Sequence, residues 1–442
     1  MRVPNRLFAT GRWFALVALP ACLGVAACAT SATVTPPAAQ TTHTTVKPPP
    51  NTVAPPPPHI SPLAKDWKAY GDTVYFGCPT EFSVGKSALE DIRPKVLDPK
   101  TADLIMPAVP MVGADEAVTG AMCALSNNVS DMKVVYVVAT TKAAPAPPTV
   151  KATAYLFDLK SSQPLATRDL PAPTPELKLA AAKDWRLAPT TTGVAWINGF
   201  ADARGASASP KTTILSNTDL ATRWDDPEQA RVWQDVLAFH REPTGAELRL
   251  PTGEPVYQDN DVAAVDAQLS DGPDKLVQIT HWESHNPPVM STTFYDLTSR
   301  SLVKFGDTDR ISGGGLVATL SDGKLFVDGR GADSSQFGYG VWNLRTQHWD
   351  LLVAREEAKK QPISKLAFFG DHLYITNSAG TFSVLALPAT NPVATNWSER
   401  PFGRISGWTL VCRGETAPQQ KGDCREILLV RDNEGRYPGP WF

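Results

Sequence analysis

The sequence predicts an all-β fold of about seven four-stranded sheets, and six to eight sheets fit the same spacing. Three observations lead to this prediction. A strand–turn–strand pattern returns along the chain, turns rich in Asp and Gly separate β-rich runs, and helical periodicity is scarce. A repeat of roughly 40–50 residues with four strands is typical of one blade of a β-propeller. The predicted fold class is therefore a β-propeller.

The repeated pattern is a hydrophobic strand that ends at a short polar turn. From Asp296 onward its copies follow at spacings of 47, 43 and 43 residues. About seven copies can be counted, which is the basis of the predicted number of blades. In chain order they are Tyr155–Ser161, Ile214–Asn217, Leu248–Leu250, Phe294–Ser299, Val341–Thr346, Val384–Pro388 and Ile427–Asp432.

Hairpin turns support the same period. Ser321–Lys324 contains Asp322-Gly323 between two β-rich runs, and Gly370–His372 occupies the corresponding place one repeat later. Asp-Gly between such runs is a strong hairpin signal. A tandem of β-sandwiches would also contain many short strands, but it would not show this self-similarity.

Two parts of the chain depart from the repeat. Glu176–Lys183 and Asp226–Phe239 are predicted to form short helical insertions. Residues 63–150 are less regular, with strand signals at Thr73–Phe76 and Lys133–Ala139. We expect this stretch to form the first blade and the closing strand.

The N-terminal segment has the features of an export signal. Three arginines precede an apolar run of 14 residues from Phe14 to Ala27, and Val25-Ala26-Ala27 stands directly before Cys28. A membrane-spanning helix needs about 20 apolar residues, so a basic start, a short apolar run and small exit residues favour a cleaved signal. This segment resembles the lipobox signal of bacterial lipoproteins.

The resemblance implies cleavage before Cys28 and a diacylglyceryl group on its thiol. Two acyl chains anchor a protein stably, so the chain would be held at the extracytoplasmic face of the cell membrane. Secretion after an A-x-A-like cleavage is the alternative, and Leu19–Cys22 is a poorer second lipobox because it contains Pro20. The expected domains are a signal peptide at 1–27, the lipidated cysteine with a linker at 28–62, and the propeller at 63–442.

The linker is predicted to be a disordered tether. Ten prolines lie between Pro36 and Pro62, among Thr and Ala. Proline lacks an N–H and disfavours helix and sheet, and the apolar content is too low for a core. A polyproline II chain of this length would extend on the order of 100 Å. The composition resembles surface lipoproteins of high-GC Gram-positive bacteria.

Charge argues against a nucleic-acid partner. The formal net charge is −3, and removal of residues 1–27 takes away three arginines and no acid, which leaves −6. No basic run is present, although a phosphate-binding surface requires one.

Cysteine usage predicts disulfides. Cys22 would leave with the signal and Cys28 would carry lipid, so four cysteines stay in the body. An even number in an exported chain favours disulfides. We expect Cys78–Cys123 and Cys412–Cys424, whereas free buried thiols are the alternative. No C-x-x-C pair occurs, so a zinc site is not expected.

Catalytic motifs are scarce. No G-x-S-x-G elbow, G-x-G-x-x-G or P-loop is present. His281-Trp-Glu283-Ser-His285 is the one cluster of histidines and a carboxylate, and strand alternation would place its three titratable side chains on one face. A polar rim is the simpler interpretation. If the chain is an enzyme, the suspects are His281, Glu283, Asp261 and His240.

No metal site is assigned. Asp259-Asn260-Asp261 and Asp307-Thr308-Asp309 contain carboxylates, but neither continues into an EF-hand loop. Exported propellers often bind calcium, so calcium is compatible with the sequence, and no other cofactor is evident.

Two functional hypotheses follow. The first is a membrane-tethered propeller that binds a protein or a cell-envelope glycan without catalysis. The second is a propeller enzyme of the sugar or lactone hydrolase or dehydrogenase type, with its site at the channel mouth. Convergence of the four suspects in one pocket would favour the enzyme.

Overall fold

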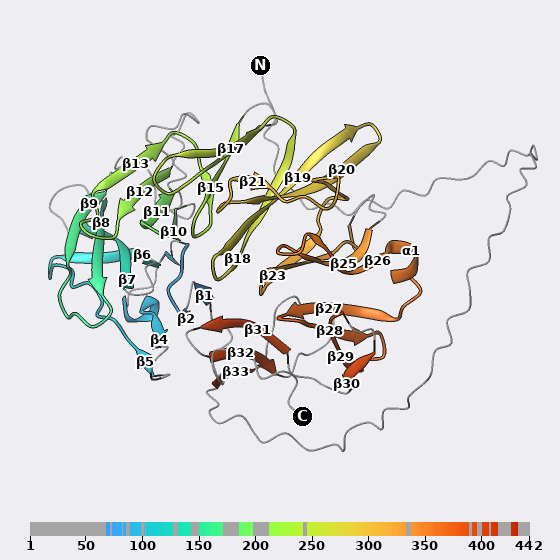
Figure 1. Cartoon of the computed structure of the whole chain (residues 1–442). Helices are drawn as coiled ribbons and strands as arrows, with labels where there is room; N and C mark the ends of the chain where they lie inside the picture. The colour runs from blue at the N-terminus through green and yellow to red at the C-terminus, as the bar shows by residue number, and fades with distance from the viewer. Residues whose placement is uncertain are drawn as a thin grey trace, which may run out of the picture. The chain divides into compact units, whose positions relative to one another are not determined.

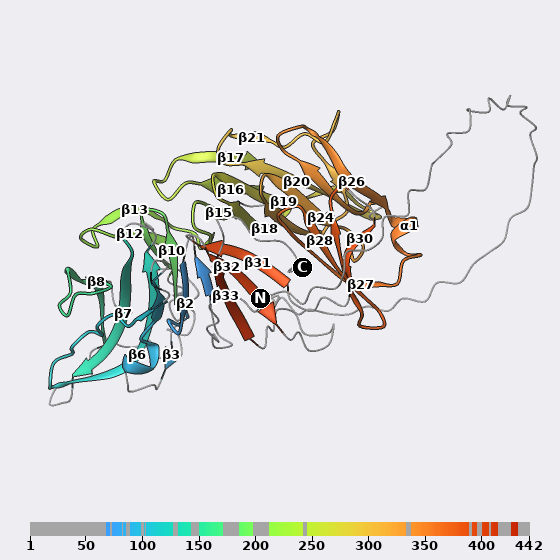
Figure 2. The ribbon, with the colours of Figure 1, turned by 60° about the horizontal axis from the view of Figure 1, so that its bottom comes forward.

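The computed structural model describes residues 68–70, 73–81, 83–84, 89–98, 101, 103–126, 131–142, 150–170, 185–197, 212–241, 245–332, 337–388, 391–395, 400–405, 408–413 and 426–431. Within these residues the regular structure is almost all β, with a 3-10 turn at Leu89–Ile92 (η1) and a short helix at Arg355–Ala358 (α1). The strands form eight antiparallel sheets (Figure 1 and Figure 2).

The first four sheets cover residues up to 259. The first contains β1 (Lys68–Tyr70), β2 (Thr73–Phe76), β4 (Lys95–Leu97) and β5 (Leu104–Ile105). The second contains β3 (Ser83–Val84), β6 (Glu116–Ser126), β7 (Lys133–Lys142), β8 (Val150–Asp158) and β9 (Ala166–Leu170). The third contains β10 (Arg186–Thr190), β11 (Gly193–Ile197), β12 (Thr212–Ser216) and β13 (Thr222–Asp226). The fourth contains β14 (Ala230–Val232), β15 (Leu237–Arg241), β16 (Gly245–Arg249) and β17 (Pro255–Asp259).

The other four sheets complete the series. The fifth contains β18 (Val262–Asp271), β19 (Asp274–His285), β20 (Pro288–Asp296) and β21 (Ser301–Leu302), with β22 (Ile311–Ser312) paired to β20. The sixth contains β23 (Val317–Ser321), β24 (Lys324–Asp328), β25 (Phe337–Asn343) and β26 (His348–Ala354). The seventh contains β27 (Ile363–Phe369), β28 (His372–Asn377), β29 (Phe382–Ala386) and β30 (Pro392–Thr395). The eighth contains β31 (Arg400–Ile405), β32 (Trp408–Arg413) and β33 (Glu426–Arg431).

The predicted β-propeller is confirmed. Successive sheets of antiparallel neighbours contact one another through their first strands, as β10 does with β14, β18 with β23, and β23 with β27. The described residues contain eight sheets rather than about seven, within the predicted range of six to eight. The seven copies of the repeat fall in the second to eighth sheets, so the first sheet is the one that the repeat did not reveal.

In the second, fifth and sixth sheets the repeat marks the end of the strand that pairs with the last strand of the sheet. Asp158, Asp296 and Asn343 end β8, β20 and β25, and each side chain accepts a hydrogen bond from the N–H two residues further on, at 2.9, 2.8 and 3.1 Å. This local bond favours the turn into the last strand. The leucine that follows in two of these copies donates its N–H to a carbonyl near the first hairpin, as Leu297 does to Lys275 at 2.9 Å and Leu344 to Gly323 at 3.0 Å.

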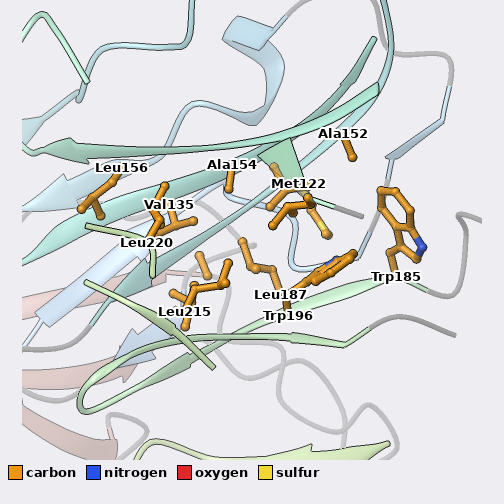
Figure 3. Packing of buried hydrophobic residues seen from close by; sticks show 14 of the residues in the cluster. Met122, Val135, Ala152, Ala154, Leu156, Trp185, Leu187, Trp196, Leu215 and Leu220 are labelled. Carbon is orange, nitrogen blue, oxygen red and sulfur yellow. The ribbon is translucent and has the colours of Figure 1, made fainter. Parts of the chain in front are cut away.

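The core lies between adjacent sheets. Figure 3 shows Met122 and Val135 of the second sheet close to Leu187 and Trp196 of the third, and all four belong to one buried cluster. The indole rings of Trp185 and Trp196 pack edge to face at 5.8 Å. Because each sheet buries both faces against its neighbours, its strands carry apolar side chains on both sides.

A short segment joins the second and third sheets. Thr80 accepts a hydrogen bond from Leu187 N–H at 2.8 Å, and Pro79 accepts one from Cys123 N–H at 2.9 Å. The preceding residues Gly77 and Cys78 have φ of 68° and 62°. Residues 79–81 therefore lie between β6 and β10, with backbone bonds to both sheets.

One predicted disulfide is confirmed and the other stays a prediction. Cys78 and Cys123 form a disulfide, and both residues are fully buried. Cys412 is also disulfide-bonded, whereas Cys424 lies outside the described residues. Cys28, the predicted signal and the predicted tether lie outside them as well.

The helix expected at Asp226–Phe239 is wrong. That stretch contains β14 and the start of β15, which pair in register from Ala230–Phe239 to Val232–Leu237. Pairing with β15 satisfies the backbone of this strand and overrides a weak local helical preference. The other predicted helix, Glu176–Lys183, lies outside the described residues. None of the described helices is long and apolar enough to span a membrane.

Candidate functional site

The His281 and Glu283 positions are set by an irregular strand. The pairing of β19 with β20 shifts between Trp282 and Ser284, so Glu283 is the extra residue of a β-bulge. A bulge re-aims the side chains around it. His281 is buried whereas Glu283 and His285 are exposed. His281 and Glu283 share a face as expected, because they bond to Thr293 and Ser291, which are two residues apart on β20, whereas the His285 ring contacts the ring of Trp282.

His281 links two sheets. Its Nε2 lies 2.7 Å from the Thr293 hydroxyl on β20, and its Nδ1 lies 3.5 Å from Asp259 Oδ2 at the end of β17. Burial lowers the pKa of His281, although the Asp259 carboxylate acts in the opposite direction. The imidazole is therefore held neutral at pH 7.

Asp259 is held on its other side by its own neighbours. The Tyr257 hydroxyl donates to Asp259 Oδ2 at 2.9 Å, and the Asp261 N–H donates to Oδ1 at 3.1 Å. Burial alone would raise the pKa of Asp259, but these hydrogen bonds and His281 outweigh it and lower the pKa. The result is a fixed chain of contacts from Tyr257 through Asp259 to His281 and Thr293.

Glu283 belongs to a separate ion pair. It accepts hydrogen bonds from the Ser291 hydroxyl and from Arg310. The bond from Ser291 is the largest influence that lowers the pKa of Glu283, and Arg310 adds to it. The carboxylate is ionised at pH 7 and its negative charge is matched by the guanidinium.

The four suspected residues do not converge. Asp261 is exposed, and its backbone, rather than its side chain, makes the contacts to Asp259 and Trp282. His240 is exposed on β15 of the fourth sheet. Among the described residues, no group of three or more His, Cys, Asp or Glu is placed to hold a metal ion.

The Asp259–His281–Thr293 chain resembles an acid–base–hydroxyl relay in its order, but Thr293 is only 1% exposed. A nucleophile must reach its substrate within about 3 Å, and a hydroxyl this deeply buried cannot. We therefore interpret these contacts as an interblade polar link.

The link gives a pH prediction. Because the folded pKa of His281 lies below its ordinary value, the unfolded chain binds more protons, and His281 reduces stability as the pH falls through about 6.5. His281→Gln keeps a polar contact to Thr293 and removes this proton. We expect the urea midpoint of the wild type to fall more than that of His281→Gln between pH 7.5 and 5.5. Equal falls would contradict the assignment.

A pocket of about 750 Å³ lies elsewhere, where the first strands of two sheets meet the linking segment. Sequence reasoning missed it because its wall comes from four separate parts of the chain, and no motif connects them. The lining residues are Thr80, Glu81, Arg186–Pro189, Ile197 and Gln229–Trp233.

The pocket combines charge with an apolar wall. Arg186 and Glu81 are both exposed and their charged atoms are 3.9 Å apart. Arg231 is also exposed and donates to the carbonyl of Val265 in the next sheet at 3.2 Å. Pro189, Val232 and Trp233 are half-buried and supply the apolar part of the wall. Pockets with a few placed polar groups on an apolar wall are typical ligand sites.

Comparison with known proteins gives no family. No family model matches the chain, and no curated protein matches it. Among solved structures, BamB from Moraxella catarrhalis is similar over 85% of this chain and 99% of its own, with 9% identity and a TM-score of 0.38. The β-propeller domain of the Trilobed protease from Pyrococcus furiosus is similar over 75% and 99%, with 9% identity and a TM-score of 0.30. Similarities at these scores carry no argument about function.

Proposed function

We propose that this chain is a lipid-anchored, extracytoplasmic β-propeller that binds a protein or a cell-envelope glycan. Cys28 would carry the anchor, residues 29–62 would form the tether, and the propeller would present the binding surface. The observation that carries the proposal is the pocket between β10, β14 and the linking segment. It offers two exposed guanidinium groups beside apolar side chains, a combination that is typical of a ligand-binding site.

The polar groups suspected of catalysis support the same proposal. His281 bonds to Thr293, and Glu283 bonds to Ser291 and Arg310. These side chains therefore make their hydrogen bonds within the fold. An enzyme would need acid and base groups directed at a shared space, whereas His281 is directed at Thr293 and Glu283 at Ser291 and Arg310.

In-cell crosslinking tests the proposal. The full chain and its Cys28→Ser variant would be expressed at equal levels, crosslinked, purified, and their partners identified by mass spectrometry. We expect the wild type in the membrane fraction with a diacylglyceryl mass on Cys28 and a specific envelope partner. Cys28→Ser should leave the membrane fraction and lose most of that partner. Equal membrane fractions for the two proteins would contradict the anchor.

A further inference from the structure

A second cavity lies between the fifth and sixth sheets, apart from the pocket of β10 and β14. It has a volume of about 520 Å³ and is bounded by the turns that follow β18, β20 and β25. Asp274 begins β19 after the first of these turns, Ser299 lies in the second and Arg345 in the third. Because separate parts of the chain form it, no sequence motif marks this cavity.

Part of the cavity wall is apolar. Leu302 and Leu344 line it as half-buried side chains, and the buried Leu276 and Val303 line it as well. Leu276, Val303 and Leu344 belong to the cluster between the fifth and sixth sheets. The wall therefore has the support of the core behind it, and an apolar group of a ligand would be removed from water against it.

Four charged residues line the cavity, and two of them are held by their neighbours. Asp296 accepts hydrogen bonds from the Thr298 N–H at 2.8 Å and from the Ser299 hydroxyl at 2.7 Å. The Lys304 Nζ lies 2.9 Å from Asp309 Oδ2. The charges of Asp296 and Lys304 are therefore engaged within their own turns.

The other two charged residues, Asp274 and Arg345, border the same small space. An atom at the Cβ position of Gly323 would lie 3.5 Å from Asp274 Oδ2 and 3.2 Å from Arg345 Nε. Gly323 has no side chain and leaves this space open. Among the residues that the structure describes, the two side chains form no ion pair or hydrogen bond, either with each other or with a third residue. A carboxylate and a guanidinium are thus neighbours, and each has no countercharge.

The two unpaired charges indicate the chemistry of the ligand. An ammonium group would donate hydrogen bonds to the Asp274 carboxylate, and a carboxylate would accept two parallel bonds from the Arg345 guanidinium. Hydrogen bonds between opposite charges are about twice as strong as those between neutral groups. An α-amino acid carries both charged groups on one carbon, so it can reach the two neighbouring side chains at once.

Other small ligands fit the charges less well. A phosphate would meet the carboxylates of Asp274 and Asp296, and a divalent cation would meet the guanidinium of Arg345. A neutral sugar would cover Asp274 and Arg345 without supplying a countercharge to either, and charges that are removed from water need one. The balance of charge in the lining therefore favours a zwitterion.

We propose that this cavity binds an α-amino acid with an apolar side chain. Its ammonium group lies on Asp274, its carboxylate on Arg345, and its side chain against Leu302 and Leu344. This solute site is separate from the pocket of β10 and β14, so the inference depends neither on the proposed anchor nor on the partner of that pocket.

Isothermal titration calorimetry tests the proposal. The probe is L-leucine, and each of two analogues lacks one of its charges: leucinamide has no carboxylate, and 4-methylpentanoate has no ammonium group. The proteins are the full chain and its Arg345→Met and Asp274→Asn variants. Arg186→Met and Asp131→Asn are the matched controls, because they make the same two replacements at exposed positions outside this cavity.

We expect leucine to bind the wild type and both controls equally, and each cavity variant at least about tenfold more weakly. Each variant should also stop discriminating against one analogue. Arg345→Met should bind leucine and leucinamide with the same affinity, and Asp274→Asn should bind leucine and 4-methylpentanoate with the same affinity. Both cavity variants should keep the wild-type urea midpoint, because neither side chain has a partner to lose among the described residues.

Other outcomes would overturn the proposal. No binding of leucine to the wild type at millimolar concentration, or equal affinity of the wild type and Arg345→Met for leucine, would show that the cavity is not an amino-acid site. Binding of inorganic phosphate that Arg345→Met abolishes would show an anion site instead. Binding of glucose that Asp274→Asn abolishes would show a sugar site.

Discussion

Arg241→Met is expected to lower the free energy of unfolding by about 3 kcal/mol. The Arg241 guanidinium contacts Asp226 at 3.2 Å, Glu228 at 2.8 Å and Glu247 at 2.6 Å. Asp226 and Glu247 are only 5% and 8% exposed. Removal of the arginine would leave the buried carboxylates without this partner. The free-energy cost of burying them unpaired exceeds the stabilisation that the intact ion pair contributes.

The loss of unfolding free energy in Arg241→Met is expected at the lower end of the range for broken buried ion pairs. Arg249 would still contact Glu247 at 2.7 Å, so one carboxylate keeps a partner. Urea unfolding followed by tryptophan fluorescence measures the change. Arg300→Met is the control, because Arg300 pairs with Glu254 at 2.7 Å on the exposed surface. A similar midpoint shift for both variants would contradict the role given to the buried network.

Removal of the Cys78–Cys123 disulfide by the double variant Cys78→Ala/Cys123→Ala should lower stability by about 4 kcal/mol. The bridge closes a loop with a sequence separation of 45 residues, and the loop-entropy relation gives this magnitude. Alanine is chosen because both positions are fully buried, where a serine hydroxyl would add a cost of its own.

The same variant should also loosen the pocket. Residues 79–81 follow Cys78 directly, and Thr80 and Glu81 form part of the pocket wall. We expect the backbone amide protons at positions 123 and 187, which bond to this segment, to exchange with deuterium faster in the variant than in the wild type. Unchanged exchange together with a loss of stability below about 1 kcal/mol would contradict the anchoring role.

Local signals predicted most of the fold. The side chains of Asp158, Asp296 and Asn343 form their turn contacts within two residues, so the repeat is visible in the sequence itself. The turn at Asp322-Gly323 joins β23 and β24 as expected, with φ of 51° and 71°. Hydrogen bonds between residues this close in the sequence do not depend on the rest of the fold.

The repeat did not reveal the first sheet because its strands are short and interrupted, although the strand signal at Thr73–Phe76 coincides with β2 and residues 63–150 were expected to contain the first blade. β1, β4 and β5 contain two or three residues each, and η1 lies between β2 and β4. β3 leaves this part of the chain to pair with β6 of the second sheet. No period of four strands is visible in such a stretch, and the pairing that defines it is with distant residues.

The candidate sites depend on contacts that a sequence does not display. His281 meets Asp259 across two sheets, and Glu283 bonds to Arg310, which follows it by 27 residues in the chain. The pocket joins residues 80–81 to residues 186–189 and 229–233. These contacts depend on how the blades pack against one another. Residue type and spacing could therefore identify the histidines as candidates but could not reveal the pocket.

The most direct test of the central claim compares two charge-reversal variants in the crosslinking experiment. Arg186→Glu/Arg231→Glu changes the pocket, and Lys160→Glu/Lys359→Glu makes the same change in net charge at exposed positions outside it. If the chain is a binding module that uses this pocket, the partner is lost from the first variant and retained by the second. Equal partner yield from both variants would contradict the claim.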